Sequence, residues 1–272
     1  MRIGKVALRV ADLSTPRSFY EEVIGMTPLD VPDLLGVKDG QQLLQLIEHP
    51  GVKPRPRRST GLYHFAVLMP TRKDLGNSFK QLIKTGYTMS GAADHLVSEA
   101  LYLPDIDQNG IELYRDRPKT EWKFDGPSVR MANEPVDLES LFQEADEEWH
   151  GLATGTTMGH VHLHVRDLDE AEKFYCGVLG FDVMLRWQPS ALFISAGGYH
   201  HHIGLNTWAG VGAPPPPKDS AGLEYFEIVL PNKEALDDVI ARLKQASVPM
   251  ADSDGGVRLH YPSENGIKLV VA

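Results

Sequence analysis

The strongest constraint on the fold of this chain is an internal repeat. The segment 4–25 returns as 159–180, and ten of the 22 aligned positions are identical. Each copy alternates apolar and polar residues, passes through an Asp-Leu turn and continues with apolar residues at helical spacing. A repeated unit of this kind buries its apolar face only by packing against its neighbours. We therefore expect a fold built from repeated strand–helix units.

The two copies differ in their histidines. Lys5 of the first copy corresponds to His160 of the second, and His162 and His164 follow His160 at alternating positions. Alternation places the three histidines on one face of a strand. Only the second copy thus carries side chains suited to metal binding. For His162 and His164 two interpretations stay open, which are lining of a pocket and filling of the sheet interior.

Two further units complete the pattern. One opens with an apolar strand at 62–69 and the other with a similar strand at 223–231, and each continues into a helical pattern. The sequence NGIEL at 109–113 recurs as NGIKL at 265–269. We therefore expect an α+β fold of four βαβββ modules.

The modules define a domain organisation. Modules one and two occupy 1–118, with the second beginning near residue 60, and modules three and four occupy 159–272, with the fourth beginning near residue 222. Between them lies an acidic connection, 119–158, in which the pattern predicts a helix at 137–148. A connection of this length is usually functional or ordered against another part of the protein.

Composition excludes several classes of protein. The 272 residues include 27 Lys and Arg against 37 Asp and Glu, and the net charge of −10 disfavours nucleic acid as a partner. The single cysteine, Cys176, excludes an intrachain disulfide and is typical of a reducing compartment. The chain opens directly on a strand pattern and has no apolar run of about 18 residues. We expect a soluble cytoplasmic protein without a membrane partner.

The four units resemble the vicinal oxygen chelate superfamily, which includes glyoxalases, bleomycin resistance proteins and extradiol dioxygenases. The resemblance covers nearly the whole chain outside the acidic connection. The segments GLYHFAVLMP at 61–70, HLVSEALYLPD at 95–105 and NGIELYRDRP at 109–118 are similar to bacillus-type catechol 2,3-dioxygenases. The resemblance implies that the modules pair into two barrel-like cups.

The resemblance also implies a metal site. In that superfamily a divalent metal is held by a His in the first strand of a module and a Glu in its last strand. Modules two and three supply His64, Glu112 and His160 at these positions. The same positions of modules one and four hold residues unsuited to a cation: Lys5, Tyr225 and Lys268. Metal ligands must lie within about 2.0–2.2 Å of one ion, so we expect modules two and three to pair, and one and four.

Two histidines and one carboxylate form the facial triad of non-haem Fe(II) oxygenases. A glyoxalase-like isomerase uses a fourth protein ligand, and here that position holds Gly204. The missing fourth ligand favours a dioxygenase, and the resemblance implies an extradiol ring-cleaving (catechol 2,3-) dioxygenase that adds O₂ to a catechol through mononuclear Fe(II), with Mn(II) as an alternative. The other hypotheses are a metal-dependent glyoxalase-like isomerase or transferase, and a non-catalytic small-molecule binding protein of the same fold.

The same resemblance assigns catalytic roles. It implies that His201 acts as an acid–base group near the bound oxygen, that Tyr102 hydrogen-bonds a substrate oxygen, and that His95 lines the opposite wall. Because three histidines are consecutive, His200 or His202 could take the place of His201. The implied partners are a small aromatic diol and O₂, in aromatic hydrocarbon catabolism. The ring substituents, the oligomeric state (with a homo-oligomer as one option) and the role of 119–158 stay open.

Overall fold

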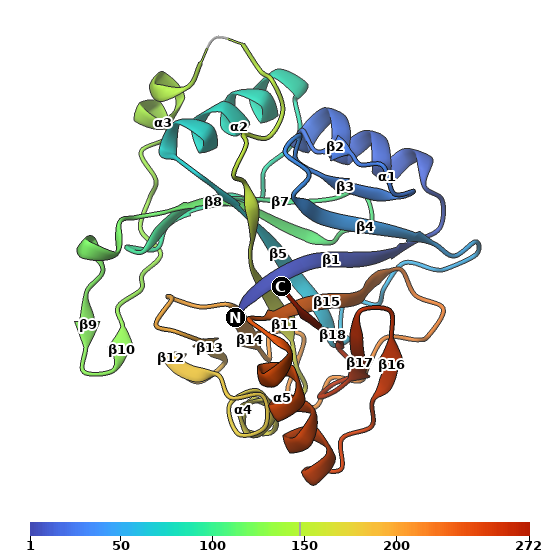
Figure 1. Cartoon of the computed structure of the whole chain (residues 1–272). Helices are drawn as coiled ribbons and strands as arrows, with labels where there is room; N and C mark the ends of the chain where they lie inside the picture. Colours follow the sequence, from blue (N-terminus) through green and yellow to red (C-terminus); the bar gives the residue numbers. More distant parts are fainter. Residues whose placement is uncertain (147) are drawn as a thin grey trace. The chain divides into compact units, whose positions relative to one another are not determined.

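The computed structural model describes residues 1–146 and 148–272, and most of its strands lie in two sheets. The strands of the first sheet are β1 (Arg2–Val10), β2 (Thr27–Pro28), β3 (Leu34–Gly36), β4 (Gln42–Glu48), β15 (Gly222–Leu230), β16 (Ala251–Ser253), β17 (Gly256–His260) and β18 (Gly266–Val271). Those of the second are β5 (Gly61–Met69), β6 (Gly91–Asp94), β7 (Ser98–Pro104), β8 (Gly110–Asp116), β11 (Thr157–His164), β12 (Asp182–Trp187), β13 (Ala191–Ser195) and β14 (Ile203–Asn206). Figure 1 labels these strands along the chain.

The strand order is that of four paired modules. The first eight-stranded sheet runs β16-β17-β18-β15-β1-β4-β3-β2, and the second runs β12-β13-β14-β11-β5-β8-β7-β6. Module one is therefore joined to module four, and module two to module three. β1 pairs antiparallel with β15, with Arg2 opposite Val229. Within modules two, three and four the first strand pairs in parallel with the last. The expected α+β fold and the expected pairing of modules are both confirmed.

The helices follow the first strands of the modules. They are α1 (Ser14–Phe19), which continues as the π-helical turn Tyr20–Ile24, α2 (Arg72–Thr85), α4 (Leu168–Tyr175) and α5 (Lys233–Gln245). Side chains cap three of these helices at their N-termini, because Thr71, Asp167 and Asn232 accept hydrogen bonds from backbone N–H groups of the first turn. In the described part of the chain no helix is both long and apolar enough to span a membrane.

The acidic connection contains short elements. They are a 3₁₀ turn (Lys119–Glu121), the hairpin β9 (Phe124–Asp125) and β10 (Ser128–Val129), and the helix α3 (Leu138–Glu144). The helix is shorter than the predicted 137–148, because Ala145 leaves the helical region with a ψ of 149°. Glu147, within the predicted range, lies outside the described residues.

The chain divides into two compact units that interleave along the sequence. The first unit comprises Met1–Arg9, Gly51–Tyr63 and His160–Ala272, and the second comprises Val10–Pro50 and His64–Gly159. In the first unit α5 packs on β15 and β18. In the second unit α2 packs on β8 and against α3 of the connection.

The glycine that begins each copy of the repeat is required by close packing. A Cβ at Gly4 would lie 2.8 Å from the Cβ of Glu227, inside any normal contact distance. A Cβ at Gly159 would overlap the hydroxyl and ring of Tyr114. In both copies the glycine therefore lets a large neighbouring side chain lie against the first strand.

The Phe-Tyr pair of the repeat is used differently in its two copies. Tyr20 is buried and its hydroxyl donates to Asp105 Oδ2 at 2.7 Å. The backbone and side-chain N–H groups of Asn109 donate to the same carboxylate, which closes the turn before β8. Burial raises the pKa of Asp105. Tyr175, the counterpart in the second copy, is equally buried, and among the described residues its hydroxyl has no hydrogen-bond partner.

This difference predicts unequal stability effects from two matched substitutions. Tyr20→Phe removes a hydrogen bond to a buried carboxylate and should lower the free energy of unfolding by about 1.5–3 kcal/mol. Tyr175→Phe removes a hydroxyl that forms no such bond and should leave the stability unchanged or slightly higher. Guanidinium unfolding of both variants at neutral pH measures the effect. Equal losses would contradict the role assigned to Asp105.

Candidate metal centre and the groups around it

Parallel pairing of β5 with β8 brings His64 and Glu112 together. Ala66 lies opposite Glu112 and His64 opposite Gly110, so both functional side chains project from one face of the second sheet. His64 Nε2 lies 3.0 Å from Glu112 Oε2, and the two residues are only 6% and 2% exposed.

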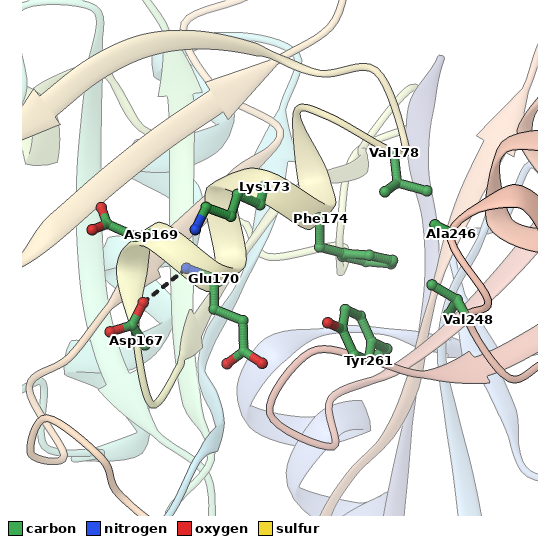
Figure 2. Close-up of a pocket in the computed structure, with 9 residues that line it drawn as sticks. All are labelled: Asp167, Asp169, Glu170, Lys173, Phe174, Val178, Ala246, Val248 and Tyr261. Atoms are coloured by element: carbon green, nitrogen blue, oxygen red, sulfur yellow. Dashed lines mark hydrogen bonds between the residues drawn. The ribbon is translucent and has the colours of Figure 1, made fainter.

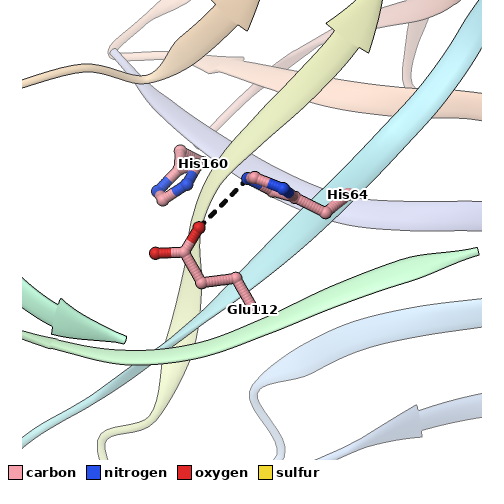
Figure 3. A group of neighbouring side chains, drawn as sticks. All are labelled: His64, Glu112 and His160. Atoms are coloured by element: carbon pink, nitrogen blue, oxygen red, sulfur yellow. Dashed lines mark ion pairs between the residues drawn. The ribbon is translucent and has the colours of Figure 1, made fainter. Parts of the chain in front are cut away.

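His160 is the third member of this group. It lies in β11 directly after Gly159, and it is buried. The ligand atoms of His64, Glu112 and His160 all lie within 4.8 Å of one another (Figure 3). Two imidazoles and one carboxylate are a suitable donor set for a divalent transition metal, and the charge of a buried carboxylate favours a cation beside it. The residues therefore fit the metal that the sequence predicted.

A fourth protein ligand is excluded at the expected position. β14 pairs in parallel with β11, and Gly204 lies opposite His162. A Cβ at Gly204 would meet the His162 ring at 2.8 Å, so a side chain at this position would displace that ring. His162 is itself buried and packs against Phe193 and Trp208. His164, further along the strand, is half-buried and pairs with Asn206 through Nδ1 at 2.6 Å.

The three consecutive histidines have different surroundings in the first unit. The ring centroid of His201 lies 4.2 Å from that of His160, whereas the His200 ring lies at 6.2 Å. His202 is directed to the end of β13, where its Nδ1 accepts from the backbone N–H of Ala196 at 3.2 Å. His200 and His201 are in contact through their Nδ1 atoms at 2.8 Å. Among these three residues, the geometry favours His201 as the group beside a metal ligand.

Tyr102 and His95 lie beside His64 and Glu112 in the second unit. Tyr102 is opposite Glu112 in the antiparallel pairing of β7 with β8, and its ring centroid lies 5.6 Å from that of His64. His95 Nε2 lies 2.6 Å from the Tyr102 hydroxyl oxygen. The structure therefore brings His95, Tyr102, His64 and Glu112 into one contiguous group.

A buried ion cluster on the opposite face of β7 and β8 was not recognised in the sequence. Glu99, which is 4% exposed, pairs with Arg72 through Nε at 2.8 Å and with Arg115 through Nε at 2.8 Å, and Arg117 lies 3.6 Å from its other oxygen. The arginines come from α2 and from the end of β8. Only the fold brings Glu99 and the three arginines together. The signal in the sequence was three arginines near the ends of a predicted helix and a predicted strand, which need an acidic partner if they are buried.

Modules one and four place an ion pair where modules two and three place metal ligands. Glu227 accepts from Lys5 Nζ at 2.9 Å, and Lys268 Nζ lies 3.7 Å from the same oxygen. Glu227 is the counterpart of Ala66 in the repeat, so a carboxylate replaces a small apolar side chain at this position. Glu227 was also missed in the sequence. The signal for it was that Lys5 and Lys268 stand at the positions that hold metal ligands in the other modules.

A separate surface hollow lies in the first unit. It encloses about 450 Å³ beside α4, with Asp167, Glu170 and Lys173 on one side and Phe174 and Tyr261 on the other (Figure 2). The Asp167 carboxylate accepts the backbone N–H of Glu170 at 2.8 Å and so serves as the N-cap of α4. None of the predicted site residues lines this hollow.

Comparison with known proteins identifies the family. Residues 2–113 and 157–255 match the model of the glyoxalase/bleomycin resistance protein/dioxygenase superfamily. The chain therefore belongs to this superfamily, and its fold is the vicinal oxygen chelate fold expected from the repeat.

A curated relative and two solved structures are similar to this chain. A catechol-2,3-dioxygenase of Bacillus subtilis (strain 168) is 46% identical over 267 residues, which cover 96% of this chain and 93% of the relative. A Bacillus subtilis protein provisionally described as a dioxygenase superposes with a TM-score of 0.67 at 12% identity, covering 100% of this chain and 85% of its own. Glyoxalase I from Zea mays superposes with a TM-score of 0.60 at 17% identity, and the match covers 99% of this chain and 92% of the glyoxalase chain. At these identities the two structures support the fold alone.

The triad predicts the effect of removing each ligand. Alanine at His64, Glu112 or His160 should abolish tight Fe(II) binding, with a loss larger than the roughly 10–100-fold that outer partners of a metal site contribute. Metal content after anaerobic loading and desalting, together with titration calorimetry, measures the loss.

His260→Ala is the control, because His260 is an exposed histidine in the other sheet. This variant should retain the metal content of the wild type. Full metal content in His64→Ala would contradict the pairing of ligands from modules two and three.

Proposed function

We propose that this chain is an extradiol ring-cleaving dioxygenase that adds O₂ to a catechol. The observation that carries the proposal is the buried set of His64, Glu112 and His160, whose ligand atoms lie within 4.8 Å of one another. Its donors are those of the facial triad that leaves positions open for substrate and O₂. The 46% identity to a catechol-2,3-dioxygenase supports the same assignment.

His64, Glu112 and His160 would hold Fe(II), with Mn(II) as the alternative metal. When bound, such a metal supplies a template that chelates the two vicinal oxygens of the diol and orients O₂ beside them. Because the three protein ligands are buried, the diol and O₂ would meet away from bulk water.

His201 would act as the acid–base group on the His160 side of the site. Its ring lies against His160 and also packs against Phe193, with centroids 5.0 Å apart. Histidine can hold or release a proton near neutral pH, and such transfers typically contribute about 10²–10⁴-fold in rate. His201 would therefore hold a proton at its imidazole nitrogen for transfer to the reacting oxygen atoms.

Tyr102 and His95 would orient the diol beside His64 and Glu112. Tyr102 lies beside His64 and opposite Glu112, and we expect its hydroxyl to contact a group bound at these residues. The 2.6 Å contact with His95 fixes the direction of that hydroxyl. A small aromatic diol is the substrate class that these contacts suit, and the single cysteine supports a cytoplasmic location.

The alternative, a glyoxalase-like isomerase, has less support from the residue at the expected fourth ligand position. An enzyme of that kind uses a fourth protein ligand, and the position that would supply it is Gly204. The His162 ring occupies the space that a side chain at this position would need. With three protein ligands, more of the coordination sphere is open to exchangeable groups, which favours the chemistry of O₂.

The dioxygenase proposal is tested by oxygen consumption. The protein is loaded anaerobically with Fe(II), mixed with catechol and then exposed to air, and an oxygen electrode and absorbance spectroscopy follow the reaction. We expect consumption of O₂ together with a yellow ring-opened product. Metal binding without oxygen consumption, across several catechols, would contradict the proposal and favour the isomerase.

The same assay tests the acid–base role of His201. His201→Asn should lower kcat by about 10²–10⁴-fold with a smaller change in KM, because the substitution removes a proton donor but no metal ligand. His260→Asn is the control, since His260 is exposed and lies in the other sheet. Equal kcat values for His201→Asn and wild type would assign the role to another residue.

A further inference from the structure

The acidic connection packs along the second unit and reaches the predicted active-site residues. It is paired with the end of β6, because Asp94 N–H donates to Glu134 O at 2.8 Å and Glu134 N–H donates to Asp94 O at 2.9 Å. One step further, Ala132 N–H donates to His95 O at 3.3 Å. The connection therefore adds a short antiparallel segment beside the residue that carries the His95 side chain.

Side chains hold this segment in place. Arg117, at the end of β8, pairs with Asp94, and its backbone carbonyl accepts from Trp122 Nε1 at 2.9 Å. Arg130 N–H donates to Lys123 O at 2.8 Å, which closes the hairpin just before Ala132. Backbone hydrogen bonds at Arg130 and at Glu134, on either side of Ala132, therefore hold its carbonyl in place.

The Ala132 carbonyl determines where the proton of His95 lies. His95 Nδ1 is 2.8 Å from Ala132 O. A carbonyl oxygen can only accept a hydrogen bond, so Nδ1 must carry the proton. In a neutral imidazole the other nitrogen is then an acceptor. His95 Nε2, which lies 2.6 Å from the Tyr102 oxygen, therefore accepts the Tyr102 hydroxyl proton.

We propose that the connection is a positioning element of the active site, which acts through this tautomer. The Ala132 carbonyl holds His95 in the Nδ1–H form, and His95 in turn directs the single hydroxyl proton of Tyr102 away from the triad. Any further hydrogen bond at the Tyr102 oxygen must then be one that the oxygen accepts. The inference rests on the proposed function in one respect, namely that the group presented to Tyr102 is a protonated hydroxyl of the bound diol.

The tautomer is measured directly by ¹⁵N nuclear magnetic resonance of the full chain. The protein is labelled at histidine and loaded with diamagnetic Zn(II), and the His95 signals are assigned from their loss in His95→Gln. We expect a protonated Nδ1 and an unprotonated, hydrogen-bonded Nε2 at neutral pH. A protonated Nε2, with or without a proton on Nδ1, would overturn the inference.

Two further variants test whether the Ala132 carbonyl or the Tyr102 hydroxyl sets the tautomer of His95. Tyr102→Phe should keep the Nδ1–H tautomer, because the Ala132 carbonyl is unchanged. Glu134→Pro removes the N–H that donates to Asp94 at an exposed position, and it should shift His95 toward the Nε2–H form. Glu134→Ala is its matched control, since it keeps the backbone hydrogen bonds. Loss of the tautomer in Tyr102→Phe, or its full retention in Glu134→Pro, would overturn the role of the connection.

Kinetics with Fe(II) and catechol link the tautomer to turnover. Glu134→Pro should lower kcat/KM by about 10-fold or more, within the range that outer partners of a metal site contribute, while Glu134→Ala matches wild type. Unchanged kcat/KM in Glu134→Pro with an altered tautomer would overturn the link to catalysis. Absence of oxygen consumption in wild type, with the expected tautomer present, would instead contradict the proposed dioxygenase function.

Discussion

A buried carboxylate must be neutralised or hydrogen-bonded, and the two module pairs meet this requirement for Glu112 and Glu227 with different groups. Glu112 and Glu227 are 2% and 8% exposed, and burial of an isolated carboxylate is costly. In modules one and four the ammonium group of Lys5, with Lys268 close by, neutralises Glu227. In modules two and three the neighbours of Glu112 are imidazoles, which bind metals in their neutral form. A divalent cation would complete the charge balance there, so that one repeat architecture yields an ion pair in one sheet and a metal site in the other.

Much of the fold could be predicted from the sequence because the repeat fixes register. Once Lys5 is aligned with His160, and NGIEL with NGIKL, the positions of His64, Glu112 and His160 within their modules follow, and convergence of the three requires modules two and three to pair. The strand order confirms that pairing. Metal binding by these residues stays a prediction, although their ligand atoms do lie together.

Other features depend on contacts between distant segments and could not be derived from local patterns. The orientations of His200, His201 and His202 follow from the turn after β13, whose shape no periodicity specifies. The short length of α3 was also not foreseeable, because its helical pattern continues past Glu144 while the backbone turns at Ala145. The contact between Ala132 and His95 joins residues 37 positions apart and involves a backbone carbonyl, which leaves no mark in the sequence.

The central claim, a metal held by His64, Glu112 and His160, is tested most directly by X-ray absorption spectroscopy at the iron edge of the Fe(II)-loaded protein. The account predicts a coordination sphere with two imidazole nitrogens and a carboxylate oxygen, with solvent in the remaining positions. His160→Ala should give no signal of protein-bound iron, and His201→Asn should keep both imidazoles. A spectrum with three or more imidazoles, or one in which His201→Asn removes a ligand, would contradict the assignment of the triad.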